Sequence, residues 1–475
     1  MIKKNRIKHP LGLPILSMTE FWERFGFYIV QGLLILYLVS KFNFSDTKSY
    51  EILGAFTALA YIMPVIGGYV ADKSLGFHLP IIVGGMLLAA GYSLLAFEQL
   101  PLLYIGLGFI TVGNGLFKPN VSSLLGFLYN DNDPRRESGF TIFYIGINAG
   151  GLFANASSGF IQQHLGWSAS FLSASVGLII GVLTFVLFKS SLQGKGQSKA
   201  KLSFKKTVLG ISFIIAITAV SIMLLKYNQV AEYVLIASTV LLFIFLIKTS
   251  FTYQNKERQQ MLGILVLIFV SILFWAIFFQ LFFSVNLFVQ RSVDRHLFSY
   301  TLPPTLFISL ENLFIIILGP FMAKLWLTLK HRNNDASLST KFSLSFFFSS
   351  FGFFILYVST TVDKGLIAPL WILFTYLFAT LGELLISPIG LSMITEYSPK
   401  KLTGLMMGVW FFSLGMGGEL AGMIAKYSAI PKDMISITAI SHFYGHAFLV
   451  YSAAAFLLGI LLFMIRPLIN SVLNT

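Results

Sequence analysis

Residues 13–40 read LPILSMTEFWERFGFYIVQGLLILYLVS, an apolar run of helical length that carries three charged side chains in its first half. A helix of about 20 such residues crosses the roughly 30 Å of hydrocarbon in a bilayer. A charge at the bilayer centre costs at least ~2.5–3.5 kcal/mol, so Glu20, Glu23 and Arg24 need a reason for their position. This stretch therefore predicts a membrane helix that contains part of a functional site.

The composition extends this interpretation to the whole chain. Of 475 residues, 56% are hydrophobic and 11% are charged, whereas about a quarter of a soluble domain is charged. The chain has no cysteine, which excludes disulfides and thiolate chemistry, and its seven histidines show no metal-binding spacing. We therefore expect no metal and no bound cofactor. The net charge of +14 lies in short loops between apolar runs, which argues against a nucleic-acid partner.

Fourteen apolar runs predict an all-α membrane protein with about fourteen spanning helices in contact with the lipid bilayer. They lie at residues 13–40, 52–72, 79–98, 101–127, 140–163, 168–188, 207–225, 230–248, 261–288, 302–327, 342–361, 366–395, 403–427 and 439–465. Most Lys and Arg residues fall in the loops that are cytoplasmic if the N-terminus is inside. Because basic loops stay on the cytoplasmic side, both termini are predicted to be cytoplasmic.

Short internal sequence repeats indicate that the chain consists of two related halves. The segment from Gly113 to Pro119 resembles the segment from Gly382 to Pro388, and the Phe-Trp pair at 21–22 matches the pair at 274–275. Parallel six-helix repeats give this pairing when the helices at 207–248 are an insertion. We predict a six-helix bundle at 1–190, a linker with two additional helices at 191–260, and a second bundle at 261–475. The part from Gln193 to Lys206 is rich in Gly, Ser and Lys, as flexible linkers are.

Charge pairing within the first helix suggests a proton site. Glu20 and Arg24 are four residues apart and share a face, which Tyr28 extends by one turn. Two carboxylates cannot both pair with one guanidinium, and like charges favour protonation of one of them. The alternative is a static salt bridge near the cytoplasmic end.

Other polar residues in spans are candidates for binding or gating. Lys118 precedes Pro119 and could face an anionic ligand group or snorkel to the interface. Glu383 and Glu311 lack a partner in their own helices. Glu419 and Lys426, two turns apart, form a candidate structural or gating pair. Asp72 lies at a cytoplasmic helix end and is a candidate for holding neighbouring helices together. The remaining pocket candidates, for which plain packing is the alternative, are Tyr61, Asn148 and Trp410.

These residues together resemble one known family. Glu20-x-x-Glu23-Arg24-Phe25-x-Phe27-Tyr28 resembles the ExxERFxYY signature of proton-dependent oligopeptide transporters, a branch of the major facilitator superfamily. The resemblance runs through nearly the whole chain. Its further motifs are Gly115 to Ser122, Phe143 to Gly150, Gly382 to Ser392 and Met407 to Trp410, and the helices at 207–248 match the two extra helices of prokaryotic members.

The resemblance implies a major facilitator fold and proton-driven import of di- and tripeptides by alternating access, with the proton as the coupling ion. It implies a multi-pass protein of the cell (inner) membrane, which we expect to be a monomer. Carried over by position, Glu20, Glu23 and Arg24 take part in proton coupling. The residues it places around the peptide are Arg24 and Lys118 at the carboxylate, Glu383 and Asn148 at the amino end, and Tyr28, Tyr61, Gln280 and Trp410 along the pocket.

Three positions depart from the family pattern. Phe279 precedes Gln280, where the family usually has an acidic residue, Glu311-Asn312 replaces Asn-Pro, and Phe27 replaces a tyrosine. We hypothesise that Glu311 substitutes for the missing carboxylate as a proton carrier or amine contact. The replacement of the family's Asn by Glu311 also makes the site proposed for the peptide amino end more acidic, which would favour cationic substrates.

Two other functions remain open from the residues alone. One is a carrier of a different small solute, with an atypical substrate or altered coupling, and the other is a sensor that binds a ligand without moving it. An enzyme is disfavoured, because no span contains an HExxH pair, paired aspartates or a nucleophile motif.

Overall fold

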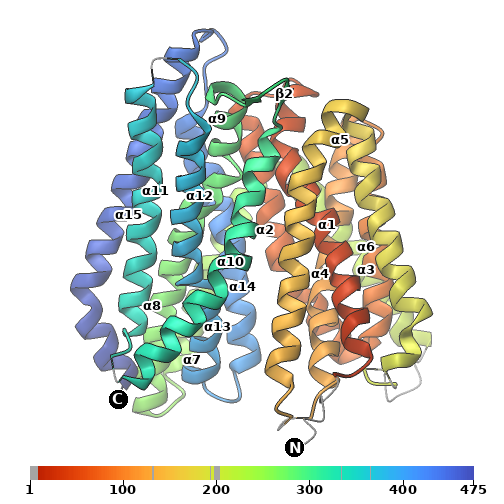
Figure 1. Ribbon diagram of the computed structural model, residues 1–475. Helices are drawn as coiled ribbons and strands as arrows, with labels where there is room; N and C mark the ends of the chain where they lie inside the picture. Colours follow the sequence, from red (N-terminus) through yellow and green to blue (C-terminus); the bar gives the residue numbers. More distant parts are fainter. Residues whose placement is uncertain are drawn as a thin grey trace, which may run out of the picture. The chain divides into compact units, whose positions relative to one another are not determined.

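The computed structural model describes residues 9–130, 133–192, 194–196, 204–332, 334–363 and 365–474 (Figure 1). Long helices make up almost all of this part of the chain. They are α1 (Gly12–Ser40), α2 (Asp46–Val70), α3 (His78–Leu95), α4 (Leu100–Phe127), α5 (Arg136–Leu187), α6 (Phe204–Lys226), α7 (Asn228–Ser250), α8 (Asn255–Phe278), α9 (Ser284–Ser292), α10 (Pro304–His331), α11 (Leu338–Val362), α12 (Pro369–Leu384), α13 (Ser387–Tyr397), α14 (Thr403–Ala425) and α15 (Ile437–Asn474).

Short elements complete the described fold. A π-helical turn, η1, covers Ala71–Leu75, and 3₁₀ turns cover Lys189–Leu192 (η2), Phe279–Leu281 (η3) and Lys426–Ser428 (η4). Strands β1 (His296–Leu297) and β2 (Tyr300–Thr301) form a small antiparallel hairpin between α9 and α10. The predicted all-α class is confirmed.

The number of spans agrees with the sequence prediction. Among the described residues, 13 helical segments are long and apolar enough to cross a membrane. One of them, α5, has 52 residues and contains Gly166 in a non-helical conformation with φ of 86°. A helix of that length would extend about 78 Å, more than twice the hydrocarbon thickness. It therefore supplies the two spans predicted at 140–163 and 168–188.

Two predicted spans are interrupted partway along their length. The run at 261–288 is divided into α8, the 3₁₀ turn η3 and α9, and the run at 366–395 is divided into α12 and α13 just before Pro388. Proline at the second position of α13 explains the second break, since its ring cannot continue the preceding helix. Such breaks are tolerated where the backbone is buried in protein.

The chain divides into two compact units. Unit 1 comprises Met1–Val30, Met63–Ala154 and Leu165–Ile222. In it, α3 and α4 pack closely, because a β-carbon built on Gly84 would lie 2.7 Å from the carbonyl oxygen of Gly113. Small residues at such points let membrane helices approach backbone to backbone.

Unit 2 comprises Gln31–Ile62, Asn155–His164 and Met223–Thr475. Its helices α10, α11, α12 and α15 are coloured green to blue in Figure 1, and α11 packs against both α12 and α15. The predicted division at 1–190, 191–260 and 261–475 follows the sequence repeat, whereas these units follow contacts. They differ because segments 31–62 and 155–164 pack with the C-terminal helices. Of the predicted linker, residues 193 and 197–203 lie outside the described part.

A backbone contact joins α2 to α14 within unit 2. A β-carbon on Gly422 would lie 2.7 Å from the carbonyl oxygen of Tyr50 and 3.1 Å from Cα of Gly54. A β-carbon on Gly418 would lie 2.4 Å from the side chain of Thr57. The first half of α2, from one predicted bundle, is thus closely packed on α14 of the other.

Candidate functional site

The charged residues of α1 form a buried cluster in unit 1. Arg24 donates two parallel hydrogen bonds to Glu23, one of 2.6 Å from Nη2 to Oε1 and one from Nε to Oε2. Nη2 also donates to Oδ1 of Asn114 on α4 at 2.7 Å. Glu20, Glu23 and Arg24 are all at most 2% exposed. Such bidentate pairing is the strong, charge-assisted kind that holds a buried guanidinium in one orientation.

Glu20 is the unmatched member of this cluster. Its Oε1 lies 3.7 Å from Nε of Arg24, and neither of its oxygens has a hydrogen-bond partner among the described residues. A buried carboxylate without such partners is costly in its charged form. The i, i+4 spacing favoured Glu20 as the partner of Arg24, but Arg24 bonds to the adjacent Glu23, and Glu20 is left without a hydrogen bond in the part of the chain that the structure describes.

Three further residues of unit 1 surround the cluster. Lys118 on α4, four residues after Asn114, is half-buried and interacts electrostatically with Glu20, Glu23 and Arg24. Tyr92 on α3 is fully buried, and its ring lies 2.6 Å from the position of a β-carbon on Gly26. A β-carbon on Gly150 of α5 would lie 3.1 Å from Cβ of Arg24. Helices α1, α3, α4 and α5 therefore all help to position the cluster.

Two further predicted pocket residues lie in unit 1. Asn148 on α5 is buried, and its Nδ2 donates to the carbonyl oxygen of Tyr144 in the same helix at 2.9 Å. Tyr28 is half-buried, one turn beyond Arg24. Their predicted contacts with a ligand stay predictions.

Unit 2 contains two acids, one buried and one half-buried, without complete partners. Glu311 on α10 is 4% exposed, and Glu383 is on the neighbouring helix α12. One oxygen of each, Oε2, lacks a hydrogen-bond partner among the described residues, and the two groups interact electrostatically. Next to Glu311, Asn312 accepts a hydrogen bond of 3.3 Å from Asn155. Unit 2 therefore contains an acidic pole that could receive a cationic group or a proton.

The position before Gln280, where the family usually has an acidic residue, lies in an aromatic cluster. Phe279 is 2% exposed, and its ring centroid is 5.8 Å from that of Tyr61 and 5.7 Å from that of Trp275. Gln280 is fully buried, and its Nε2 donates to the carbonyl oxygens of Ala276 and Ala421. Its Oε1 accepts from Ser284 at 2.8 Å. Gln280, predicted to contact substrate, thus has its amide occupied in joining η3 to α14.

Trp410 is positioned by close packing in unit 2. It is 2% exposed, and a β-carbon on Gly390 of α13 would lie 2.0 Å from its ring. Any larger residue at Gly390 would have to displace the indole. The predicted role of Trp410 at a substrate side chain stays a prediction.

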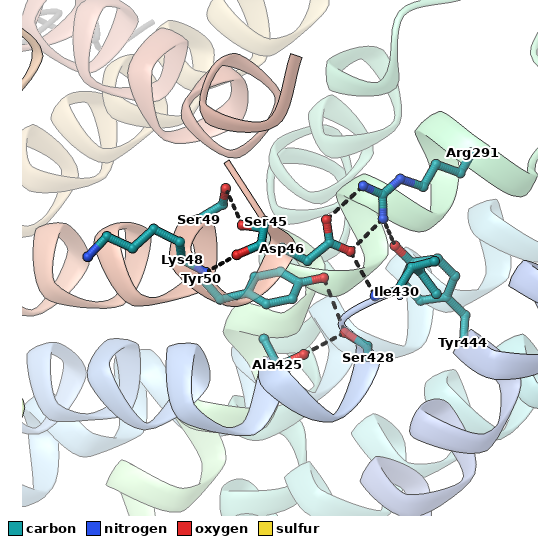
Figure 2. Close-up of polar contacts among 10 residues, drawn as sticks. All are labelled: Ser45, Asp46, Lys48, Ser49, Tyr50, Arg291, Ala425, Ser428, Ile430 and Tyr444. Atoms are coloured by element: carbon teal, nitrogen blue, oxygen red, sulfur yellow. Dashed lines mark hydrogen bonds and ion pairs between the residues drawn. The ribbon is translucent and has the colours of Figure 1, made fainter. Parts of the chain in front are cut away.

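A second polar network lies at the ends of α2, α9 and α15 in unit 2 (Figure 2). Arg291 donates to both oxygens of Asp46, at 2.6 and 2.7 Å, and to the hydroxyl of Tyr444 at 2.9 Å. Asp46 also accepts the backbone N–H of Ile430 at 3.0 Å. On the next turn of α2, the Tyr50 hydroxyl lies 3.2 Å from the hydroxyl of Ser428. The network ties the start of α2 to three C-terminal elements.

Lys426 pairs differently from the sequence interpretation. Its Nζ lies 3.1 Å from Oε1 of Glu51 and 3.9 Å from Oε2 of Glu232, so these are its ion-pair partners, rather than Glu419. Glu419 is buried, with Oε2 unpaired among the described residues. Asp72 is exposed in η1. The gating roles of Asp72, Glu419 and Lys426 stay predictions.

Sequence reasoning missed Asn114, Asp46, Arg291 and Tyr444. Asn114 carried a usable signal, since it is a polar residue in an apolar span, one helical turn before Lys118. Asp46 and Arg291 carried none, because each resembles an ordinary loop charge and they lie 245 positions apart.

Comparisons with known proteins agree with this architecture. The model of the POT family matches residues 79–441. The dipeptide and tripeptide permease A of Proteus mirabilis is 30% identical over 98% of this chain and 96% of its own. The dipeptide and tripeptide permease B of Photorhabdus asymbiotica is 31% identical over 98% of this chain and 97% of its own. The crystal structure of tetrameric PepTSo2 superposes with a TM-score of 0.86 at 28% identity, covering 97% of this chain and 99% of that one.

Both the predicted resemblance and the major facilitator fold are thereby confirmed. The match extends along nearly the entire chain, and the relatives are transporters rather than enzymes. With a family match over residues 79–441 and permease relatives of similar length, this multi-pass membrane protein belongs to the POT family of transporters.

Proposed function

We propose that this protein is a proton-coupled symporter that imports di- and tripeptides by alternating access through the cell (inner) membrane, with both termini in the cytoplasm. It uses no cofactor besides the proton, and it works as a monomer. The buried Glu20–Glu23–Arg24 cluster is the observation that carries this proposal.

Charge balance links the proton to the peptide. Glu20 and Glu23 offset Arg24 and Lys118, so the four groups sum to zero when all are ionised. Adding a peptide carboxylate leaves one uncompensated negative charge in a buried environment, which is costly. A proton on Glu20, the acid without a hydrogen-bond partner, restores neutrality. Peptide and proton therefore favour each other's binding, as symport requires.

Acids outside the spans are poorly suited to this role. Hydrogen bonds from Arg135 hold the pKa of Asp133 at about 2, and hydrogen bonds from His296 lower the pKa of Asp294. Asp133 consequently stays charged across the pH range in which a proton gradient operates. The proton carriers that we propose instead are the buried acids Glu20 and Glu311.

The direct test is uptake of a labelled dipeptide into proteoliposomes with an imposed inward proton gradient. We expect accumulation that collapses when an ionophore dissipates the gradient. Counterflow of labelled peptide separates a carrier from a sensor, because only a carrier exchanges ligand across the membrane. Absence of uptake and counterflow for every di- and tripeptide would contradict the proposal and favour another small solute.

The Asp46–Arg291–Tyr444 network is proposed to hold the external end shut. Replacing Arg291 with glutamine leaves Asp46, which is 5% exposed, without its cation. Breaking a fully buried pair costs about 3–5 kcal/mol. Because the Arg291 side chain is 23% exposed, a smaller cost should favour the state in which this end is open. We expect the maximal uptake rate to fall at least tenfold, while the concentration for half-maximal uptake stays equal or falls.

Initial uptake rates across a range of peptide concentrations measure this effect. Arg295→Gln is the matched control, since Arg295 lies four residues away and donates to backbone carbonyl oxygens rather than to an acid. An Arg291→Gln protein with unchanged maximal rate would show that the network does not gate.

A further inference from the structure

The pair of additional helices, α6 and α7, is divided between the two units. Unit 1 ends at Ile222, near the end of α6, and unit 2 resumes at Met223. In unit 1, α6 packs on α4, since a β-carbon on Gly108 would lie 2.4 Å from Ile222. In unit 2, α7 packs against α8 and α14. Only 17% of an 18-residue apolar stretch of α7 is buried inside the protein, so the few polar contacts of this helix are notable.

Those contacts form a closed ring with α2 and with the end of α14. Lys48 donates to Oδ1 of Asn228 at 2.6 Å and lies 3.9 Å from Glu51. Glu51 lies 3.1 Å from Lys426, and Lys426 lies 3.9 Å from Glu232. Asn228 and Glu232 are four residues apart on α7, so they lie on one face. We call these five residues the α7 ring.

The α7 ring spans the glycine contact between α2 and α14. Glu51 is one residue after Tyr50 and three before Gly54, whose backbones meet Gly422, and Lys426 is one turn after Gly422. One face of α7 therefore contacts both partners of a helix pair that comes from different halves of the sequence. In the alternating access proposed above, α2 and α14 separate when the external end opens, and this separation breaks the α7 ring.

We propose that α7 takes part in gating, with Asn228 and Glu232 as positioning residues that hold Lys48 and Lys426 across the α2–α14 contact and so favour the externally closed state. The proposal rests on the symport function and the orientation proposed above. It gives the additional helix pair a role in setting how often the external end opens. Because an externally open state must form before peptide binds, the population of that state scales the apparent affinity.

A single thiol can report this opening without any transport. The chain has no cysteine, so Thr57→Cys introduces one thiol at a side chain that is 2% exposed and faces Gly418. We would measure its reaction rate with a membrane-impermeant maleimide applied to the external side, with and without Glu232→Gln. Solvent-exposed ion pairs change such equilibria modestly, so we expect a labelling rate about 1.5- to fivefold higher in the Glu232→Gln protein.

A double-mutant cycle distinguishes positioning from general destabilisation. Glu232→Gln and Lys426→Gln should give less than additive effects on labelling, since each removes the same ion pair. Glu257→Gln, at an exposed acid in the first turn of α8, is the matched control and should leave labelling unchanged. In uptake, Glu232→Gln should lower the half-maximal peptide concentration by a similar factor.

The outcomes separate this proposal from the proposed function. Faster labelling with coupled effects supports the α7 ring even if the wild-type protein moves no peptide. Wild-type peptide uptake with unchanged labelling of the Glu232→Gln protein, or with additive effects of the two substitutions, would overturn the α7 proposal alone.

Discussion

Replacing Arg24 with glutamine is expected to lower proton-driven peptide uptake at least 100-fold. The substitution removes both bonds to Glu23 and the bond to Asn114, and it leaves two carboxylates with no exposed surface facing Lys118 alone. Leaving a buried ion without its partner costs about 3–5 kcal/mol, and each 1.4 kcal/mol corresponds to tenfold in an equilibrium. The peptide carboxylate also loses the guanidinium fork proposed to bind it. Uptake into proteoliposomes at fixed protein content measures this loss.

Two further variants separate lost function from lost folding. In Arg24→Gln with Glu23→Gln the unpaired charge is gone, so thermal stability should recover while uptake stays low. Arg24→Lys keeps the charge but not the planar fork, and should retain only part of the uptake. Arg258→Gln, at a residue bonded to Asn255 within the first turn of α8, is the control for loss of an arginine. Near-normal uptake by the Arg24→Gln protein would remove the cluster from the mechanism.

The spans were predictable because the bilayer imposes a length and a polarity that the sequence must satisfy. Fourteen apolar runs were enough to predict the all-α membrane class. The free-energy cost of placing a charge in the bilayer identified the candidate site residues Glu20, Glu23, Arg24, Glu311 and Glu383. The break at η3 was not predictable in the same way. Its run at 261–288 contains no proline, and the side chain of Gln280 bonds there to Ala421 on a helix 141 positions away.

The pairing of charges was the least predictable part of the site. The i, i+4 spacing places Glu20 on the face of Arg24, and only the orientation of the Arg24 side chain shows that Glu23 takes the hydrogen bonds and Glu20, among the described residues, is left without them. Lys426 faces Glu51 and Glu232 instead of Glu419, although all these groups interact electrostatically. Periodicity places residues on a face, but it does not tell which helix that face meets.

Replacing Glu311 with glutamine is expected to abolish proton dependence while leaving peptide exchange. The position where the family usually has an acid is occupied by Phe279 in this chain, and Phe279 packs among aromatic rings that would not stabilise a charge. Glu311 is buried in the same unit with one oxygen unpaired, and glutamine keeps its shape without a titratable proton. The Glu311→Gln protein should therefore show counterflow near the wild-type rate. Its gradient-driven accumulation should fall to the equilibrium level.

Glu396→Gln, an exposed acid on α13, is the matched control and should accumulate peptide normally. Proton-driven accumulation that persists in the Glu311→Gln protein would reject Glu311 as the substitute carboxylate and leave the coupling to Glu20. Loss of both counterflow and accumulation would instead make Glu311 a contact of the peptide amine. In that case dipeptides with an added cationic side chain should lose more uptake than neutral ones, because the acidic pole formed with Glu383 would be halved. The pair of assays thus assigns Glu311 either to the proton or to the substrate.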